Sequence, residues 1–203
     1  MNLARLSFIF ALALAGVVGV GVYVWAGCGA CGPAAAPSGA KPGIATTTPF
    51  NVLDVTGPAK GEKLCYICRY GGRPSVVIFT RTTTGHFVDL VKAVDKFVAD
   101  HKEQRAAAFA VLLGEDNAAN REALTKLAAD HKLSIPLTIA ADGAKGPSAY
   151  KLDSACATLA LVANKNKVEA AFTVKCDAAS CDNAQCSPAA DVVAAADRLI
   201  GGH

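Results

Sequence analysis

The sequence predicts an α/β domain with a central sheet covered by helices, and two observations lead to this fold class. Short apolar runs rich in β-branched residues alternate with longer segments whose apolar residues recur every three or four positions. Their order over residues 75–200 is strand, helix, strand, helix, strand, hairpin and helix, which is typical of a sheet flanked by helices. The length of 203 residues fits one domain with a short appendage. A hydrophobic content of 52% excludes intrinsic disorder, and a net charge of +3 without a basic run argues against a nucleic-acid partner.

The first expected unit is a helix between two strands. Residues 75–80 form a short β-branched run, as in a buried strand. Residues 105–113 contain a second apolar run of the same kind. The segment between them, 87–101, carries apolar side chains at helical spacing: Phe87, Leu90, Val91, Val94 and Val98.

The remaining elements complete the sheet and its cover. They are a helix over 117–131, a strand over 136–140, a hairpin of runs 158–162 and 168–172 around a polar turn, and a helix over 188–200. Ser187 is the expected N-cap of the last helix, with Pro188 at its first position, because serine hydroxyls satisfy free amides and proline lacks one.

Residues 1–27 have the composition of a targeting segment. One charged residue, Arg5, precedes a nearly unbroken apolar run from Leu6 to Ala26, long enough to cross a bilayer as a helix and also typical of an export signal. The small residues before Cys28 resemble the lipobox of bacterial lipoproteins, although Trp25 stands where leucine or valine is usual. Lipidation of Cys28, an uncleaved membrane anchor and plain secretion all remain open. Each would place the domain outside the cytoplasm, where disulfides persist.

Residues 28–48 are small, rich in proline and glycine, and almost uncharged. Such a composition cannot form a core, so we expect a flexible tether that leads to a domain over residues 49–203. Cys28 and Cys31 form a CxxC in this tether, but no scaffold is expected there to position an active thiol pair.

The order of elements resembles the thioredoxin fold, in the redoxin form shared by peroxiredoxins and membrane-tethered thiol reductases. Residues 50–57 resemble the lead-in strands of that group, and residues 70–79 its entry to the first central strand. Residues 135–139 resemble the extra strand of redoxins, and residues 151–172 the closing hairpin. The resemblance covers residues 49–200 and implies a central mixed sheet flanked by helices.

The usual active site of that family is missing from this sequence. The family's catalytic cysteines follow the first central strand at the start of the next helix, where the helix dipole and free amides lower a thiol pKa. Here the window 80–86 reads Thr-Arg-Thr-Thr-Thr-Gly-His and contains no cysteine. The family's cis-proline position falls near Ala157, which follows Cys156. Peroxidase chemistry is therefore not expected. For His86 we favour the interpretation as a neighbour of the helix N-cap over the alternative that it binds a ligand.

Cys65 and Cys68 form a CxxC before the first central strand. Two thiols at this spacing can close a reversible disulfide, provide half of a four-sulfur metal site, or stiffen a loop. Residues 64–71 also resemble the knuckle of zinc ribbons and rubredoxins, and the basic neighbours Lys63 and Arg69 favour thiolate in either case. We expect Cys65 and Cys68 to be the catalytic pair, with the more exposed thiolate attacking a partner disulfide. The family resemblance implies that Cys65 is this nucleophile.

Four cysteines lie late in the chain and are candidates for structural disulfides: Cys156, Cys176, Cys181 and Cys186. The last three occupy one polar loop and leave one cysteine over from any internal pair. In the alternative interpretation, two of them complete a four-cysteine site with Cys65 and Cys68, suited to zinc, copper or an iron–sulfur centre. No motif specifies the metal.

The function that these observations predict is thiol–disulfide exchange by a membrane-tethered, extracytoplasmic thioredoxin-like protein of the cell envelope. Its expected partners are protein thiols or disulfides, its membrane contact is the N-terminal anchor or lipid, and no cofactor is expected. Two alternatives stay open. One is a non-catalytic binding module with structural disulfides, and the other is a cysteine-based metal-binding domain.

Overall fold

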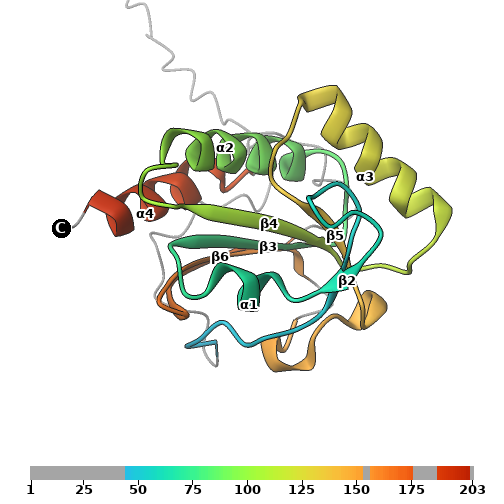
Figure 1. The fold of residues 1–203 in the computed structure, drawn as a ribbon, viewed down its shortest axis with the longest axis horizontal. Coiled ribbons are helices and arrows are strands. Elements are labelled where there is room, and N and C mark those ends of the chain that lie inside the picture. The colour runs from blue at the N-terminus through green and yellow to red at the C-terminus, as the bar shows by residue number, and fades with distance from the viewer. Residues whose placement is uncertain (1–43, 153–155, 176–186, 202–203) are drawn as a thin grey trace, which may run out of the picture. The chain divides into compact units, whose positions relative to one another are not determined.

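Within residues 44–152, 156–175 and 187–201, which the computed structural model describes, seven strands form one mixed sheet (Figure 1). The strands are β1 (Val52–Asp54), β2 (Lys63–Leu64), β3 (Ser75–Thr80), β4 (Ala107–Leu112), β5 (Leu137–Ala140), β6 (Cys156–Asn164) and β7 (Lys167–Lys175). The helices are α1 (Tyr66–Tyr70), α2 (His86–Asp100), α3 (Ala118–His131) and α4 (Ala189–Gly201), with 3₁₀ turns η1 (Gly143–Lys145) and η2 (Ser148–Tyr150). The predicted order of strands and helices from residue 75 onward is confirmed.

The strand order across the sheet is β2-β1-β5-β4-β3-β6-β7. The central strands β3, β4 and β5 are parallel, and the strands on both flanks pair antiparallel. β3 pairs with β4 from Ser75 opposite Ala107 to Thr80 opposite Leu112. The carboxyl ends of β3 and β4 therefore lie at the same edge of the sheet.

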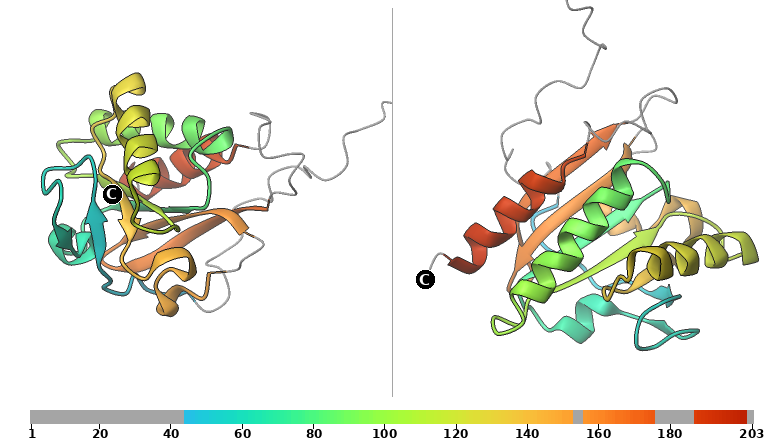
Figure 2. Two further views of the ribbon diagram at one scale, coloured as in Figure 1. Left: turned by 90° about the vertical axis from the view of Figure 1, so that its right-hand side faces the viewer. Right: turned by 90° about the horizontal axis from the view of Figure 1, so that it is seen from above.

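Helices cover both faces of the sheet, so the central strands are buried on both sides. α2, α3 and α4 lie on one face, and α1 and the 3₁₀ turns lie on the other (Figures 1 and 2). Val76 and Ile78 of β3 pack with α2 and α4, whereas Val77 and Phe79 pack with α1 and η2. This alternation follows from the two-residue period of a strand.

The three long helices follow the expected spacing closely. The buried face of α2 contains Phe97 in place of the expected Val98, which is only half-buried. Asn117 caps α3, since its side chain accepts the amide of Asn120. Ser187 accepts the amide of Ala189 at 3.3 Å and so serves the first turn of α4 as expected.

The hairpin of β6 and β7 turns tightly at Lys165 and Asn166. Both residues have left-handed backbone conformations, with φ of 51° and 62°. Two consecutive left-handed residues are the signature of a type I′ turn, whose twist matches that of the flanking strands. The strands extend further than the apolar runs alone predicted.

The expected boundary between tether and domain, at residues 48 and 49, is too late in the chain. Ile44 is buried, and Thr46 pairs with Lys167 at the edge of the hairpin. The amide of Thr47 donates to the Asn166 carbonyl at 2.8 Å. The packed part therefore includes residues 44–48, which a composition of small polar residues did not reveal because main-chain pairing holds them.

The predictions for the remaining N-terminal residues lie outside the described part. These predictions are the targeting segment 1–27, Cys28, Cys31 and the tether up to residue 43. Among the helices that the structure describes, none combines the length and the apolar character needed to span a bilayer.

Candidate functional site

The first turn of α1 holds Cys65 and Cys68 together as a disulfide. Their Cα atoms are 5.3 Å apart, within the range that a disulfide bridges without backbone movement. Cys65 is the N-cap of α1, and the amide of Cys68 donates a hydrogen bond of 3.1 Å to its Sγ. Gly71 ends the helix with φ of 59°, a left-handed C-cap. The backbone of this turn thus allows the predicted disulfide between the two cysteines.

The two residues between the cysteines anchor the pair to the core. Tyr66 and Ile67 are buried at 1% and 6% exposure, whereas Cys65 is half-buried and Cys68 is exposed. The ring of Tyr66 contacts that of Phe109 in β4, with centroids 5.2 Å apart. The turn that carries the disulfide is therefore packed against the core through Tyr66 and Ile67, and Cys68 is exposed to solvent.

Asp54, at the end of β1, holds Tyr66 in place through a hydrogen bond. The residue is 1% exposed, and its carboxylate accepts the Tyr66 hydroxyl at 2.7 Å. It also accepts the amides of Gly57 at 2.7 Å and Ala59 at 2.8 Å. A side chain at Gly57 would place its Cβ 2.6 Å from the Tyr66 oxygen, so only glycine fits there. The buried charge is compensated by three donors, as such a group requires.

Sequence reasoning missed Asp54 as part of the site. A single acidic residue inside the apolar run Val52–Val55 was the available signal, because carboxylates are rarely buried without partners. Its main side-chain partner lies twelve residues away, in a helix that the pattern did not predict.

The pKa values of the two tyrosine hydroxyls of α1, Tyr66 and Tyr70, are raised above the ordinary value for tyrosine. Burial, with the hydrogen bond to Asp54 and its charge, raises the pKa of Tyr66, while Arg69 opposes this rise. Burial also raises the pKa of Tyr70, whose hydroxyl donates to the Ala108 carbonyl at 2.8 Å. Both tyrosines thus act as hydrogen-bond donors that hold α1 to the sheet.

Comparison with known structures identifies the architecture. A protein assigned as the thiol:disulfide interchange protein DsbE of Chlorobium tepidum matches with a TM-score of 0.53 and 15% identity, over 75% of this chain and 95% of the other. Peroxidoxin BcpB of Mycobacterium tuberculosis matches with a TM-score of 0.54 and 14% identity, over 76% and 95%. The chain has the thioredoxin fold.

A third neighbour extends the same group. The bacterioferritin comigratory protein of Xanthomonas campestris matches with a TM-score of 0.52 and 12% identity, over 74% of this chain and 92% of the other. These neighbours are redoxins, as the sequence resemblance implied. Identities this low show the fold and leave the chemistry to the residues of the site. No family model matches the chain, and no curated protein matches it.

A buried hydrogen-bonded network lies where β3 ends and α2 begins, in the window 80–86 that the sequence singled out for its lack of cysteine. His86 is the first residue of α2 and is fully buried, and its Nε2 lies 2.9 Å from the Thr158 hydroxyl. Thr158 lies 3.2 Å from the Thr80 hydroxyl, which donates to the Thr82 carbonyl. These contacts join β3, α2 and β6. His86 directly follows the N-cap Gly85, the place next to the helix cap that was expected for it.

Ala157, near which the resemblance placed the family's cis-proline, directly precedes Thr158 of this network. The carbonyl of Ala157, in β6, accepts the amide of Arg81 at 2.8 Å. Cys156 begins β6, but its side chain lies outside the described part, as do Cys176, Cys181 and Cys186. The structural-disulfide predictions for these four residues therefore remain predictions.

The metal-site alternative receives no support from the described residues. Among these, no cluster of three or more His, Cys, Asp or Glu side chains could hold a metal ion. A disulfide between Cys65 and Cys68 leaves neither sulfur as a thiolate ligand. A four-cysteine site would thus require the reduced pair together with two of Cys176, Cys181 and Cys186, which lie outside the described residues.

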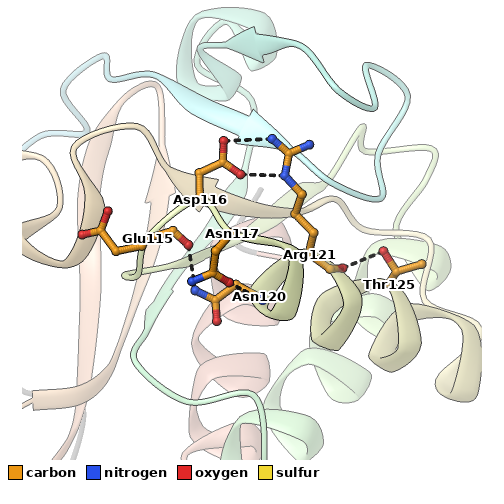
Figure 3. A network of polar contacts seen from close by, with 6 residues as sticks. All are labelled: Glu115, Asp116, Asn117, Asn120, Arg121 and Thr125. Atoms are coloured by element: carbon orange, nitrogen blue, oxygen red, sulfur yellow. Dashed lines mark hydrogen bonds and ion pairs between the residues drawn. The ribbon is translucent and has the colours of Figure 1, made fainter.

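A second cluster of polar side chains, which could be considered as a functional site, lies at the start of α3 (Figure 3). Arg121 donates to both oxygens of Asp116, at 2.6 and 2.8 Å, and this hydrogen bonding holds the pKa of Asp116 below its usual range. Asn120 donates to the Glu115 carbonyl at 2.7 Å. The contacts of Glu115, Asp116 and Asn117 close the loop onto the first turns of α3, so the network is a capping structure on the surface. Lys63 also lowers the pKa of Asp116, which places the start of α3 close to β2.

Proposed function

We propose that this chain exchanges disulfides with protein thiols through the Cys65–Cys68 pair. The observation that carries the proposal is a bonded CxxC at a helix start, with one exposed sulfur, on a thioredoxin fold. Proteins with this fold use such a pair at the end of the first central strand, and here the pair lies on the opposite face, in α1. The peptide amide of Cys68 supplies the thiolate stabilisation that the usual site takes from its helix.

The reaction consists of two exchanges. A partner thiolate attacks Sγ of Cys68, the bond between Cys68 and Cys65 breaks, and Cys65 leaves as a thiolate that accepts the Cys68 amide. A second thiolate of the partner then attacks its own sulfur in the mixed disulfide, which releases Cys68 and leaves the partner oxidised. The reverse sequence reduces a partner disulfide at the expense of the reduced pair.

Exposure assigns the partner-bonding role to Cys68, whereas family analogy assigned it to Cys65. Cys68 is exposed and Cys65 is half-buried behind it. The hydrogen bond to Cys65 also makes its sulfur the better leaving group, because lower-pKa thiols leave faster. Cys65 is then the resolving cysteine.

Catalysis of insulin reduction by dithiothreitol tests the proposal. The full chain should accelerate the reaction, and Cys65→Ser with Cys68→Ser should abolish the acceleration. Cys31→Ser breaks the other CxxC of the chain, in the tether, and serves as the matched control that should retain it. Acceleration that survives in the double variant would exclude this pair. A chain that never accelerates the reaction would favour a binding module stiffened by disulfides.

We further propose that the domain is tethered at the outer face of a membrane. Three features of the sequence support this location: the apolar run 6–26, the small residues before Cys28, and eight cysteines in one chain. Metabolic labelling with palmitate tests the lipid form of the tether. Label that disappears in Cys28→Ser would support a lipoprotein, and an unlabelled chain that stays in the membrane fraction would support the helical anchor.

A further inference from the structure

Basic residues flank the disulfide on both sides in the sequence. Lys63 lies two residues before Cys65, and Arg69 directly follows Cys68. Both are exposed, and among the described residues neither forms an ion pair with a carboxylate. Lys60 and Arg73 extend the positive charge along the same segment, in which Glu62 is the single acidic residue.

The charged groups near α1 differ in their exposure and in whether they are paired. Arg69 acts electrostatically on both phenols of α1, so its guanidinium lies close to the helix. The carboxylate of Asp54 is buried and accepts hydrogen bonds from Tyr66 and two amides. Asp116 lies near Lys63, but its charge is paired with Arg121. The exposed charges that flank the disulfide are therefore mostly cationic.

We infer that the Cys65–Cys68 pair reacts preferentially with anionic thiols, so that its protein partner carries acidic residues beside the reacting cysteine. This inference rests on the proposed exchange function. An attacking thiolate and the leaving Cys65 thiolate share one negative charge over three sulfurs, and nearby cations stabilise that arrangement. A carboxylate next to the partner thiol adds attraction before the reaction, which raises the rate of encounter.

Reduction of the pair by three small thiols of different charge measures this preference. Mercaptopropionate is anionic, mercaptoethanol is neutral and cysteamine is cationic. Each rate constant is divided by that of the same thiol with the uncharged disulfide of mercaptoethanol, which removes differences in nucleophilicity. Cys65 and Cys68 are the only cysteines between Lys60 and Arg81, so alkylation and mass analysis of the peptides from this segment follow them alone in the full chain.

The variant Lys63→Gln with Arg69→Gln removes the two cations. Lys92→Gln with Lys126→Gln is the matched control, because it changes the net charge equally at exposed positions of α2 and α3, on the other face of the sheet. At about 10 mM ionic strength we expect the normalised rate for mercaptopropionate to exceed that for cysteamine about tenfold in the wild type and in the control. In the Lys63→Gln, Arg69→Gln variant, and in about 1 M salt, the ratio should fall to about two or less.

A wild-type ratio near one at low salt would overturn the inference while leaving the exchange function intact. An unchanged ratio in the Lys63→Gln, Arg69→Gln variant would overturn it as well, because the preference would then come from elsewhere. A pair that resists all three thiols would overturn the exchange function and the inference together.

Discussion

Asp54 is the residue on which the geometry of the candidate pair depends most. Its carboxylate joins β1, the loop at Gly57 and Ala59, and the Tyr66 hydroxyl of α1. Tyr66 stands between the two cysteines, so its position sets the direction in which Cys65 and Cys68 face. Hydrogen bonds to a buried charged group contribute more than neutral ones, about 1.5–3 kcal/mol each.

Tyr66→Phe should therefore weaken both the fold and the closed form of the pair. We expect a loss of about 1.5–3 kcal/mol in the free energy of unfolding, measured in urea. We also expect the reduction potential of Cys65–Cys68 to rise by about 10–20 mV, because a less restrained turn closes the disulfide less favourably. Equilibration with glutathione buffers of defined potential measures this second effect.

Tyr150→Phe is the matched control for this substitution. Tyr150 is equally buried in the same core cluster, and its hydroxyl donates to the Thr48 carbonyl at 2.8 Å. Its loss should lower the free energy of unfolding by about 0.5–1.5 kcal/mol, because this acceptor is neutral, and should leave the reduction potential unchanged. Equal shifts of the potential in both variants would contradict the positioning role of Asp54 and Tyr66.

At the scale of elements, α1 is stable only through what surrounds it. Five residues are too few for an independent helix, so the disulfide, the buried Tyr66 and Ile67, and the glycine C-cap hold it. After α1, Gly72 lies against the hairpin turn, where an added Cβ would meet Lys165 Cα at 3.3 Å. The type I′ turn of β6 and β7 thus supports the end of the segment that carries the cysteines.

Alanine substitutions at Gly71 and Gly72 separate backbone strain from this contact. Both glycines have positive φ, 59° and 78°, but an added Cβ at Gly71 meets nothing within 4 Å. Gly71→Ala should lower the free energy of unfolding by about 1 kcal/mol, the strain alone. Gly72→Ala should lower it by about 2–3 kcal/mol, since the hairpin must also move. Equal losses in urea unfolding would show that the hairpin contact has no effect on stability.

The elements with a clear period were predictable from sequence, and those held by tertiary contacts were not. The runs that became β3, β4 and α2 carry their own pattern of apolar residues, and the polar turn between β6 and β7 marked the hairpin. α1 has no period to detect, and Ile44–Thr48 is held by main-chain pairing with the hairpin. The CxxC was visible as a motif, whereas its support by Asp54 depends on a contact between distant segments.

For the whole molecule, the buried tyrosines predict a sharp loss of stability in alkali. Burial raises the pKa of Tyr150 to about 12, and the pKa values of Tyr66 and Tyr70 are raised as well. In the unfolded chain these phenols ionise near pH 10. Above that pH the unfolded state releases protons that the folded state keeps, so stability falls as the pH rises from about 10 to 12.

The slope of this loss is measurable. Each retained proton contributes about 1.4 kcal/mol per pH unit, and three tyrosines give at most about 4 kcal/mol per unit. Tyrosinate absorbance and circular dichroism should change together, in one cooperative transition. Ionisation of all three phenols near pH 10 with the fold intact would contradict their burial.

The reduction potential of the Cys65–Cys68 pair in the full chain tests the central claim most directly. Disulfides that take part in exchange have potentials of about −120 to −270 mV, whereas structural disulfides lie below about −300 mV. We predict a value in the first range, with Cys65 and Cys68 exchanging reversibly when the glutathione ratio is changed. A value below about −300 mV would contradict the account, because Cys65–Cys68 would then be a structural disulfide in a thioredoxin fold.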